Sequence, residues 1–189
     1  MRIIGGQYRG LVLADVGAGD PSAHLRPTSD RVREAMFNLL VNGGYGDPVT
    51  GARVLDLFAG TGALGLEALS RGAARVAFVD DGAAARALLR RNIEKMHAMG
   101  VTDVWRRDAT RLGPNRGPGY GLIFLDPPYG KGLGEAAIAS ALEGGWVAPD
   151  AMIVWEESAP PALPPSLTLL DQRKYGDTVV TLASPTPTA

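Results

Sequence analysis

A carboxylate, two prolines and an aromatic ring stand in a row in the stretch Asp126-Pro127-Pro128-Tyr129, directly after an apolar run. The Asp126 side chain and the carbonyl between the prolines can both accept hydrogen bonds from an amine, and the fixed φ angles of proline hold these acceptors rigid. The ring of Tyr129 can stack on a flat base, a contact worth about 1–3 kcal/mol. The four residues therefore predict a socket for a planar heterocycle that carries an amino group. A rigid turn that ends a strand is the alternative.

Such an amine is a poor nucleophile because its lone pair is delocalised into the ring. Two acceptors that bind its hydrogens pull the nitrogen toward tetrahedral geometry, so that a methyl group on a sulfonium about 3 Å away can be attacked in line. Asp126 need not be a strong base, since the product amine can lose its proton after the transfer. The socket is therefore suited to methyl transfer.

A glycine-rich loop supplies a candidate site for the methyl donor. Gly60, Gly62 and Gly65 have the spacing G-x-G-x-x-G between a predicted strand and a predicted helix. The spacing fits NAD, FAD and S-adenosylmethionine (SAM) sites alike, and a tight strand-to-helix turn is the structural alternative. Asp56 stands just upstream, where a dinucleotide site would need room for an anionic pyrophosphate. A carboxylate there favours the cationic amino or sulfonium group of SAM.

Four successive predicted strands end at or next to an aspartate, namely Asp56, Asp80, Asp108 and Asp126. Ligands of open α/β sheets bind outside the carboxyl ends of the strands, so these four side chains are expected at one site.

The two middle acids suit the nucleoside part of a cofactor. Asp80 can accept hydrogen bonds from both hydroxyls of a ribose, and Asp81 can share or replace that role. Asp108, followed by Ala109, can bind an adenine amino group, although a helix cap explains Asp108 equally well.

The elements that must position these residues follow from the apolar pattern. Strands alternating with helices predict an α/β fold with an open, mostly parallel sheet and helices on both faces. The chain begins with a hairpin-like pair of short strands around Gly5-Gly6 in residues 1–14. Near the C-terminus, residues 159–165 form a stiff Pro-rich connector. The remaining predicted strands are 53–58, 74–80, 102–108, 121–126, 151–157, 167–172 and 177–183. The predicted helices are 63–72, 83–99, 134–144 and a first helix that follows the candidate caps Thr28-Ser29-Asp30 and ends at Gly43-Gly44.

Composition narrows the class of protein. The 189 residues suit one domain, divided into an extension at 1–27, a main domain at 28–184 and a frayed tail at 185–189. A net charge of -1 argues against a globally basic nucleic-acid coat, although Arg2 and Arg9, and a run of arginines in 104–118, form local basic patches. The absence of cysteine excludes disulfides and thiolate metal sites, and no metal is expected. Without a signal peptide or a membrane-spanning run, the cytoplasm is the expected compartment.

The motifs resemble a known family. "DLFAGTGALG" followed by "FLDPPYG" is similar to the class I SAM-dependent amino-methyltransferases. The flanking blocks "MRIIGGQYRG", "RPTSDRVREAMFNLL", "EALSRGA" and "YGDT" resemble the RsmD family of bacterial small-subunit ribosomal RNA guanine-N2 methyltransferases, from Met1 to about Leu182. The resemblance implies a Rossmann-like, seven-stranded sheet and SAM as donor. It also implies N2 methylation of one guanine of 16S rRNA (position 966 in the usual rRNA numbering), in the small subunit or its assembly intermediate, by a protein expected to be a monomer.

The resemblance also implies roles for residues. Those expected to bind the methionine side of SAM are Asp56, Phe58, Ala59, Gly60, Thr61 and Gly62. Asp80 or Asp81 would hold the ribose, Asp108 and Ala109 would meet the adenine, and Asp126, Pro127, Pro128 and Tyr129 would bind the guanine. Those expected to face RNA are Arg2, Tyr8, Arg9, Arg26, Thr28 and Arg31. Asp80 stands where many relatives have Glu, which keeps the carboxylate and changes its reach.

Three other functions stay open at this point. An adenine-N6 methyltransferase acting on DNA or RNA uses the same four-residue motif, but a DNA enzyme would need a target-recognition domain for which the chain has no room. A nicotinamide-dependent oxidoreductase could use the glycine loop but would leave Asp56 and Asp126 without a task. A catalytically silent RNA-binding assembly factor would keep the fold alone.

Overall fold

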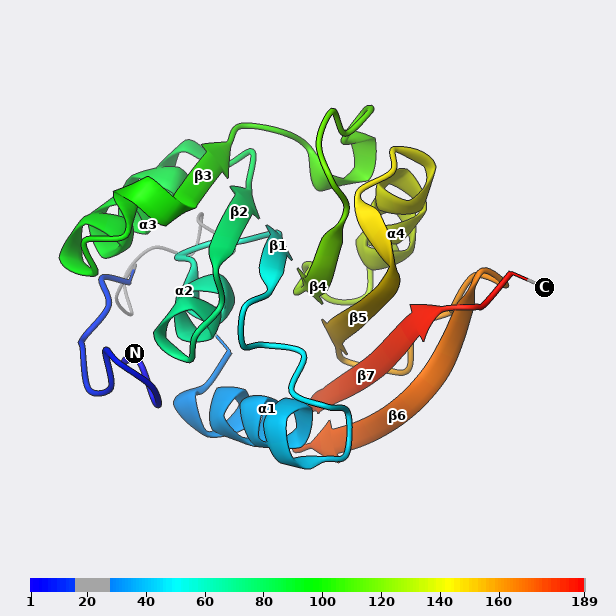
Figure 1. Ribbon diagram of the computed structural model, residues 1–189, viewed down its shortest axis with the longest axis horizontal. Helices are drawn as coiled ribbons and strands as arrows, with labels where there is room; N and C mark the ends of the chain where they lie inside the picture. Colours follow the sequence, from blue (N-terminus) through cyan, green and yellow to red (C-terminus); the bar gives the residue numbers. More distant parts are fainter. Residues whose placement is uncertain (16–27, 189) are drawn as a thin grey trace.

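A seven-stranded sheet forms the centre of the protein in the computed structural model, which describes residues 1–15 and 28–188 (Figure 1). Its strand order is β3-β2-β1-β4-β5-β7-β6, with β7 antiparallel to both β5 and β6 and the other pairs parallel. This arrangement confirms the predicted mostly parallel α/β sheet. The strands are β1 (Arg53–Leu57), β2 (Arg75–Val79), β3 (Thr102–Trp105), β4 (Tyr120–Leu125), β5 (Val147–Glu157), β6 (Leu167–Tyr175) and β7 (Thr178–Pro185).

Helices cover both faces of the sheet, because successive side chains of its buried strands point to opposite sides. Val54 and Phe124 belong to an apolar cluster with α1 (Asp30–Asn42), α2 (Ala63–Ser70) and α3 (Ala83–Lys95). Their neighbours Leu55 and Leu125 pack on the opposite face with α4 (Leu133–Glu143) and the short 3-10 helix η4 (Ala109–Arg111).

Helix α3 ends at Lys95, four residues before the predicted end at 99. His97 has a φ of 51°, its N–H donates to Glu94 O, and the Ala98 N–H donates to Ile93 O. These two bonds form a Schellman cap. The longer prediction was wrong because the left-handed position, usually occupied by glycine, holds a histidine here. A 3-10 turn at Met99–Val101 then leads into β3.

The N-terminal segment keeps the predicted hairpin-like course, although its two arms are too short to form regular strands. An antiparallel bridge joins Arg2 to Val12, and the N–H groups of Ile3 and Leu13 donate to Leu11 O and Met1 O. The tip of the chain reversal binds α2. The Glu67 carboxylate accepts the N–H groups of Ile4 and Gly5, each at 2.9 Å. These donors at the tip dock the segment on the domain, while the arms on either side pair with each other.

The C-terminal pair β6 and β7 confirms the predicted antiparallel closure. Ordered structure extends into the segment expected to fray, since Pro185 ends β7 and the Thr186 N–H donates to Ser166 O at 2.8 Å. No helix in the described part of the chain is long and apolar enough to cross a membrane.

Candidate active site

The sheet register brings the predicted site together at one edge. Leu57 pairs with Val79 and Leu125, and Leu125 pairs with Trp155. The residues after these four, which are Phe58, Asp80, Asp126 and Glu156, therefore leave β1, β2, β4 and β5 at the same level. This is the carboxyl edge at which open α/β sheets bind their ligands.

The glycine loop after β1 needs its glycines for different reasons. Gly60 and Gly62 have φ angles of 58° and 83°, which favour glycine. Gly65 lies in α2, where an added Cβ would come within 2.4 Å of the Phe78 ring of β2. Phe58 also has a positive φ, of 58°, although it carries a side chain. Strain of this kind concentrates at functional sites, so the backbone supports a binding role for the loop.

Asp56 lies buried beneath this loop, with a side-chain oxygen 2.9 Å from the Gly65 N–H that donates to it. Burial, together with the nearby Asp80 charge, raises its pKa to about 8, against the hydrogen bond from Gly65, which acts to lower it. The carboxyl group is therefore largely protonated at neutral pH. A cationic group bound at the loop would favour its ionised form.

Asp80 fastens the glycine loop to the end of β2. One of its oxygens accepts the Gly60 N–H at 2.9 Å and the other accepts the Gly82 N–H at 2.8 Å. Each oxygen keeps a second acceptor site for a ligand hydroxyl. Asp81, next along the chain, is exposed.

Asp108 caps η4, because it accepts hydrogen bonds from the Thr110 N–H at 2.8 Å and the Thr110 hydroxyl at 2.7 Å. These bonds hold its pKa below the usual range. The helix-cap interpretation is confirmed. The side chain remains exposed and Ala109 is buried beside it, so a contact with adenine stays a prediction.

The amine socket at the end of β4 contains a second carboxylate that the sequence interpretation missed. The Thr28 hydroxyl lies 3.2 Å from an Asp126 oxygen and 2.7 Å from an oxygen of Glu156, at the end of β5. Burial first, and then the Glu156 charge, raise the pKa of Asp126 well above its usual range. Thr28 was predicted to face RNA. Its side chain instead points inward at these two acids and is only 8% exposed.

Tyr129 is tied to the same acid. Its hydroxyl donates to the other Glu156 oxygen at 2.9 Å and lies 3.2 Å from the Thr178 hydroxyl of β7. Glu157 accepts the Gly130 N–H at 3.1 Å, which holds the turn after the socket. Two acids at the end of the otherwise apolar run "AMIVW" could have been found by the rule that selected Asp126, because both follow a buried strand to the carboxyl edge.

The remaining residues predicted to face RNA lie in two places. Arg2 and Arg31 are exposed at the start of α1, where Arg2 Nε lies 3.9 Å from an Asp30 oxygen. Tyr8 and Arg9 lie at the chain reversal, where the Tyr8 N–H donates to Ser70 Oγ in the last turn of α2. An eight-residue helix is about 12 Å long, so this tip lies well away from the glycine loop. Arg26 lies outside the described residues.

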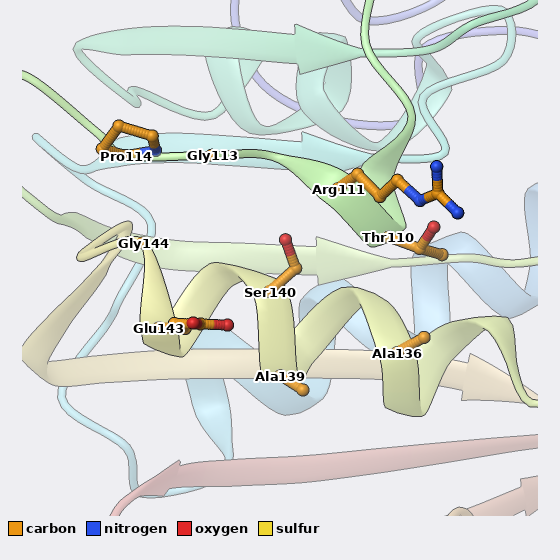
Figure 2. A pocket seen from close by; sticks show the side chains of 9 residues that line it. All are labelled: Thr110, Arg111, Gly113, Pro114, Ala136, Ala139, Ser140, Glu143 and Gly144. Atoms are coloured by element: carbon orange, nitrogen blue, oxygen red, sulfur yellow. The ribbon is translucent and has the colours of Figure 1, made fainter.

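A separate groove of about 740 Å³ runs between η4 and α4 (Figure 2). Thr110, Arg111, Ala136 and Ser140 are among its lining residues, and Arg111 points toward the carboxyl ends of the strands. None of the socket residues lines this groove. Of the arginines in the predicted basic run, Arg107 is structural, since its guanidinium packs 4.3 Å from the centre of the Trp105 ring.

Comparisons with known proteins agree with this geometry. A family profile described as Conserved hypothetical protein 95 matches residues 1–184. Ribosomal RNA small subunit methyltransferase D of Escherichia coli K12 is 39% identical over 164 residues, 87% of this chain and 78% of that protein. Putative rRNA methyltransferase YlbH of Bacillus subtilis is 37% identical over 188 residues, 96% of this chain and 97% of that protein. The solved structure of putative methyltransferase yhhF from Escherichia coli has a TM-score of 0.82 and 36% identity, and the match covers 98% of this chain and 97% of that one.

Proposed function

The chain belongs to the RsmD family and has its class I methyltransferase fold, and we propose that it transfers a methyl group from SAM to rRNA of the small ribosomal subunit. The observation that carries the proposal is the meeting of two sites at one sheet edge. The glycine loop with Asp56 and Asp80 suits the methyl donor, and the socket around Asp126 suits an amine. An oxidoreductase would need the first site and have no use for the second.

The residues of the first site fit SAM. Asp56 is a buried carboxyl group whose raised pKa falls when a cation binds nearby. The loop glycines leave backbone bare for a close approach, and Asp80 has acceptor sites for the ribose hydroxyls. When bound, SAM supplies an electrophilic methyl group on its sulfonium. We assign Phe58 to Gly62, Asp81, Asp108 and Ala109 to the same site, as the family resemblance implies.

For the acceptor we propose the exocyclic N2 amine of a guanine in 16S rRNA, the target implied by the resemblance. Asp126 and the carbonyl of Pro127 accept the hydrogens of the amine, and the Pro128 ring keeps the turn rigid. The ring of Tyr129 stacks on the base. A stacked or paired base cannot present its amine to this edge, so the nucleotide is expected to be flipped out. Arg2 and Arg31 would bind the RNA backbone beside the socket, with Tyr8 and Arg9 further along α2.

One experiment tests the function and its target. The protein is incubated with labelled SAM and, in separate reactions, small subunits from a strain without the modification, naked 16S rRNA and duplex DNA. We expect label in rRNA that nuclease digestion identifies as N2-methylguanine. Label in N6-methyladenine would refute the guanine assignment. No label in any substrate, with SAM binding intact, would instead support a silent assembly factor.

Asp126→Ala gives the matching test of the socket. The substitution removes an acceptor for the amine and touches no group of the glycine loop. We expect methyl transfer to fall to background while the Kd for SAM stays within about threefold of the wild type. A large loss of SAM affinity would show that Asp126 belongs to the donor site.

A further inference from the structure

We propose that Glu156 is a positioning residue of the methyl-transfer site, which holds the acceptor Asp126 and the stacking ring of Tyr129 in one fixed arrangement. The inference rests on the proposed function and extends it to a residue on a strand outside the four-residue motif. Glu156 does not itself meet the base. It is 3% exposed, and among the described residues Thr28 and Tyr129 donate hydrogen bonds to it.

The first half of the arrangement passes through Thr28. A threonine hydroxyl has one hydrogen, so it can donate to only one of the two carboxylates beside it. The oxygen–oxygen distance is 2.7 Å to Glu156 and 3.2 Å to Asp126, which assigns the hydrogen to Glu156. Thr28 therefore abuts Asp126 without using its acceptor capacity. That capacity remains available for the hydrogens of the amine.

The second half fixes the ring. The other Glu156 oxygen accepts the Tyr129 hydroxyl at 2.9 Å, and Thr178 lies 3.2 Å from the same hydroxyl. A phenol held at its far end cannot swing about its Cα–Cβ bond, so the plane on which a base stacks is set before the base arrives. Such preorganisation lowers the cost of reaching the reactive geometry.

The sheet register explains why the Glu156 carboxylate can reach both Thr28, beside Asp126, and the Tyr129 hydroxyl. Leu125 of β4 pairs with Trp155 of β5, so Asp126 and Glu156 leave neighbouring strands side by side. Val180 of β7 pairs with Glu156 on its other side, which brings Thr178 within reach of the tyrosine hydroxyl. The three strands thus hold Glu156 between the acceptor and the platform.

The test compares Glu156→Gln with Glu157→Gln, a matched control. Both substitutions replace a carboxylate by an amide at adjacent buried positions of β5. The hydrogen bonds that Glu157 accepts come from Gly130 and Ser158 and all reach one oxygen, so the glutamine amide can keep them, whereas the two oxygens of Glu156 accept from two different side chains. We expect Glu156→Gln to lower kcat about 10- to 100-fold, the loss typical of a misplacement of about 1 Å. The Kd for SAM and the Tm should stay close to those of the wild type, and Glu157→Gln should lose far less activity. Equal losses in the two variants, or a kcat within twofold of wild type for Glu156→Gln, would overturn the proposal.

A double-mutant cycle with Tyr129→Phe tests the route. Tyr129→Phe keeps the stacking ring and removes its anchor, so the combined variant should lose clearly less than the product of the single losses. Independent, multiplicative losses would refute action through the ring. If Glu156→Gln does not fold, Thr28→Val and Thr28→Ser replace it. Serine keeps the hydroxyl and should restore most of the activity that valine loses, and no difference between them would refute the Thr28 half.

The wild-type reaction separates the two proposals. If the wild-type enzyme methylates small-subunit rRNA and Glu156→Gln has the same kcat, the inference alone is refuted. A wild-type enzyme that binds SAM but methylates no rRNA refutes the proposed function.

Discussion

The buried Asp56 makes SAM binding depend on pH. In the free protein this carboxyl group has a pKa of about 8, mainly because burial disfavours its charge. If the cationic part of SAM binds above it, the ionised form is favoured and the pKa falls. Binding then releases a proton, and the affinity must rise as the pH rises toward 8.

The size of the effect follows from that pKa. A group with a pKa of about 8 is roughly 1% ionised at pH 6 and half ionised at pH 8, so the Kd for SAM should fall by up to about 50-fold over that interval. Close to one proton, roughly 0.9, should be released for each SAM bound at pH 7.

Isothermal titration calorimetry measures both quantities. The binding enthalpies observed at pH 7 in phosphate and in Tris differ from each other. The difference equals the number of protons released multiplied by the difference between the ionisation enthalpies of the two buffers. Asp56→Asn is the matched control, because the amide keeps an acceptor for the Gly65 N–H and cannot ionise. The amino group of SAM itself has a pKa near the same range. The proton release that remains in Asp56→Asn therefore measures the titration of that amino group.

The reasoning would be refuted by a Kd that changes less than threefold between pH 6 and pH 8. It would be refuted equally by a proton release that Asp56→Asn leaves unchanged. Either result would mean that no cationic group of SAM binds near this carboxylate.

Three further predictions concern stability and the docked N-terminal segment. Because the folded-state pKa of Asp56 is raised from 3.8 to about 8, its contribution to the free energy of unfolding is full below pH 3.8 and is lost as the pH rises to 8. Urea unfolding measures this loss. Between pH 5 and pH 8, the free energy of unfolding should fall less in Asp56→Asn than in the wild type, by up to about 1.4 kcal/mol per pH unit. Gly65→Ala would bring a methyl group to 2.4 Å from the Phe78 ring and should cost about 1–3 kcal/mol in urea unfolding, whereas Gly100→Ala, with open space around it, should cost little. Asn92→Ala removes the amide that joins Thr61 O to Ala14, which should raise the KM for SAM and lower the free energy of unfolding by about 1–3 kcal/mol; an unchanged KM would show that the loop does not need this support.

Local signals were enough for the sheet and for most of the site. Val54 and Leu55 alternate between the two faces, and the strand-end acids Asp56, Asp80 and Asp126 follow from a rule about the edge of the sheet. The end of α3 was missed because His97 adopts a backbone conformation that its residue type does not announce. The strand pattern, the strand-end acids and the end of α3 all depend on residues close together in the sequence.

Long-range contacts account for what the sequence could not predict. The Thr28 side chain meets Glu156, 128 residues along the chain, and only the register between β4 and β5 brings that acid beside Asp126. The docking of the N-terminal hairpin could not be predicted for the same reason, because the N–H groups of Ile4 and Gly5 bond to Glu67, more than 60 residues away. A pattern of residue types shows that an acid ends a strand. It does not show which distant side chains form hydrogen bonds with that acid.

One buried side chain, Asn92, supports both the N-terminal segment and the glycine loop, which bears on how the two substrates meet. The Asn92 amide donates to Thr61 O in the loop and to Ala14 O, and its oxygen accepts the Ala14 N–H. The Arg33 guanidinium, fully buried, bonds the carbonyls of Thr28 and Arg2 and lies 3.6 Å from Glu67. The two ends of the N-terminal segment, at Arg2 and Ala14, are therefore joined to residues beside the donor and acceptor sites, while its tip lies further along α2. RNA that binds this segment meets a surface already fixed relative to the methyl donor, so positioning of the base depends less on a closing motion than on the rigidity of these buried side chains.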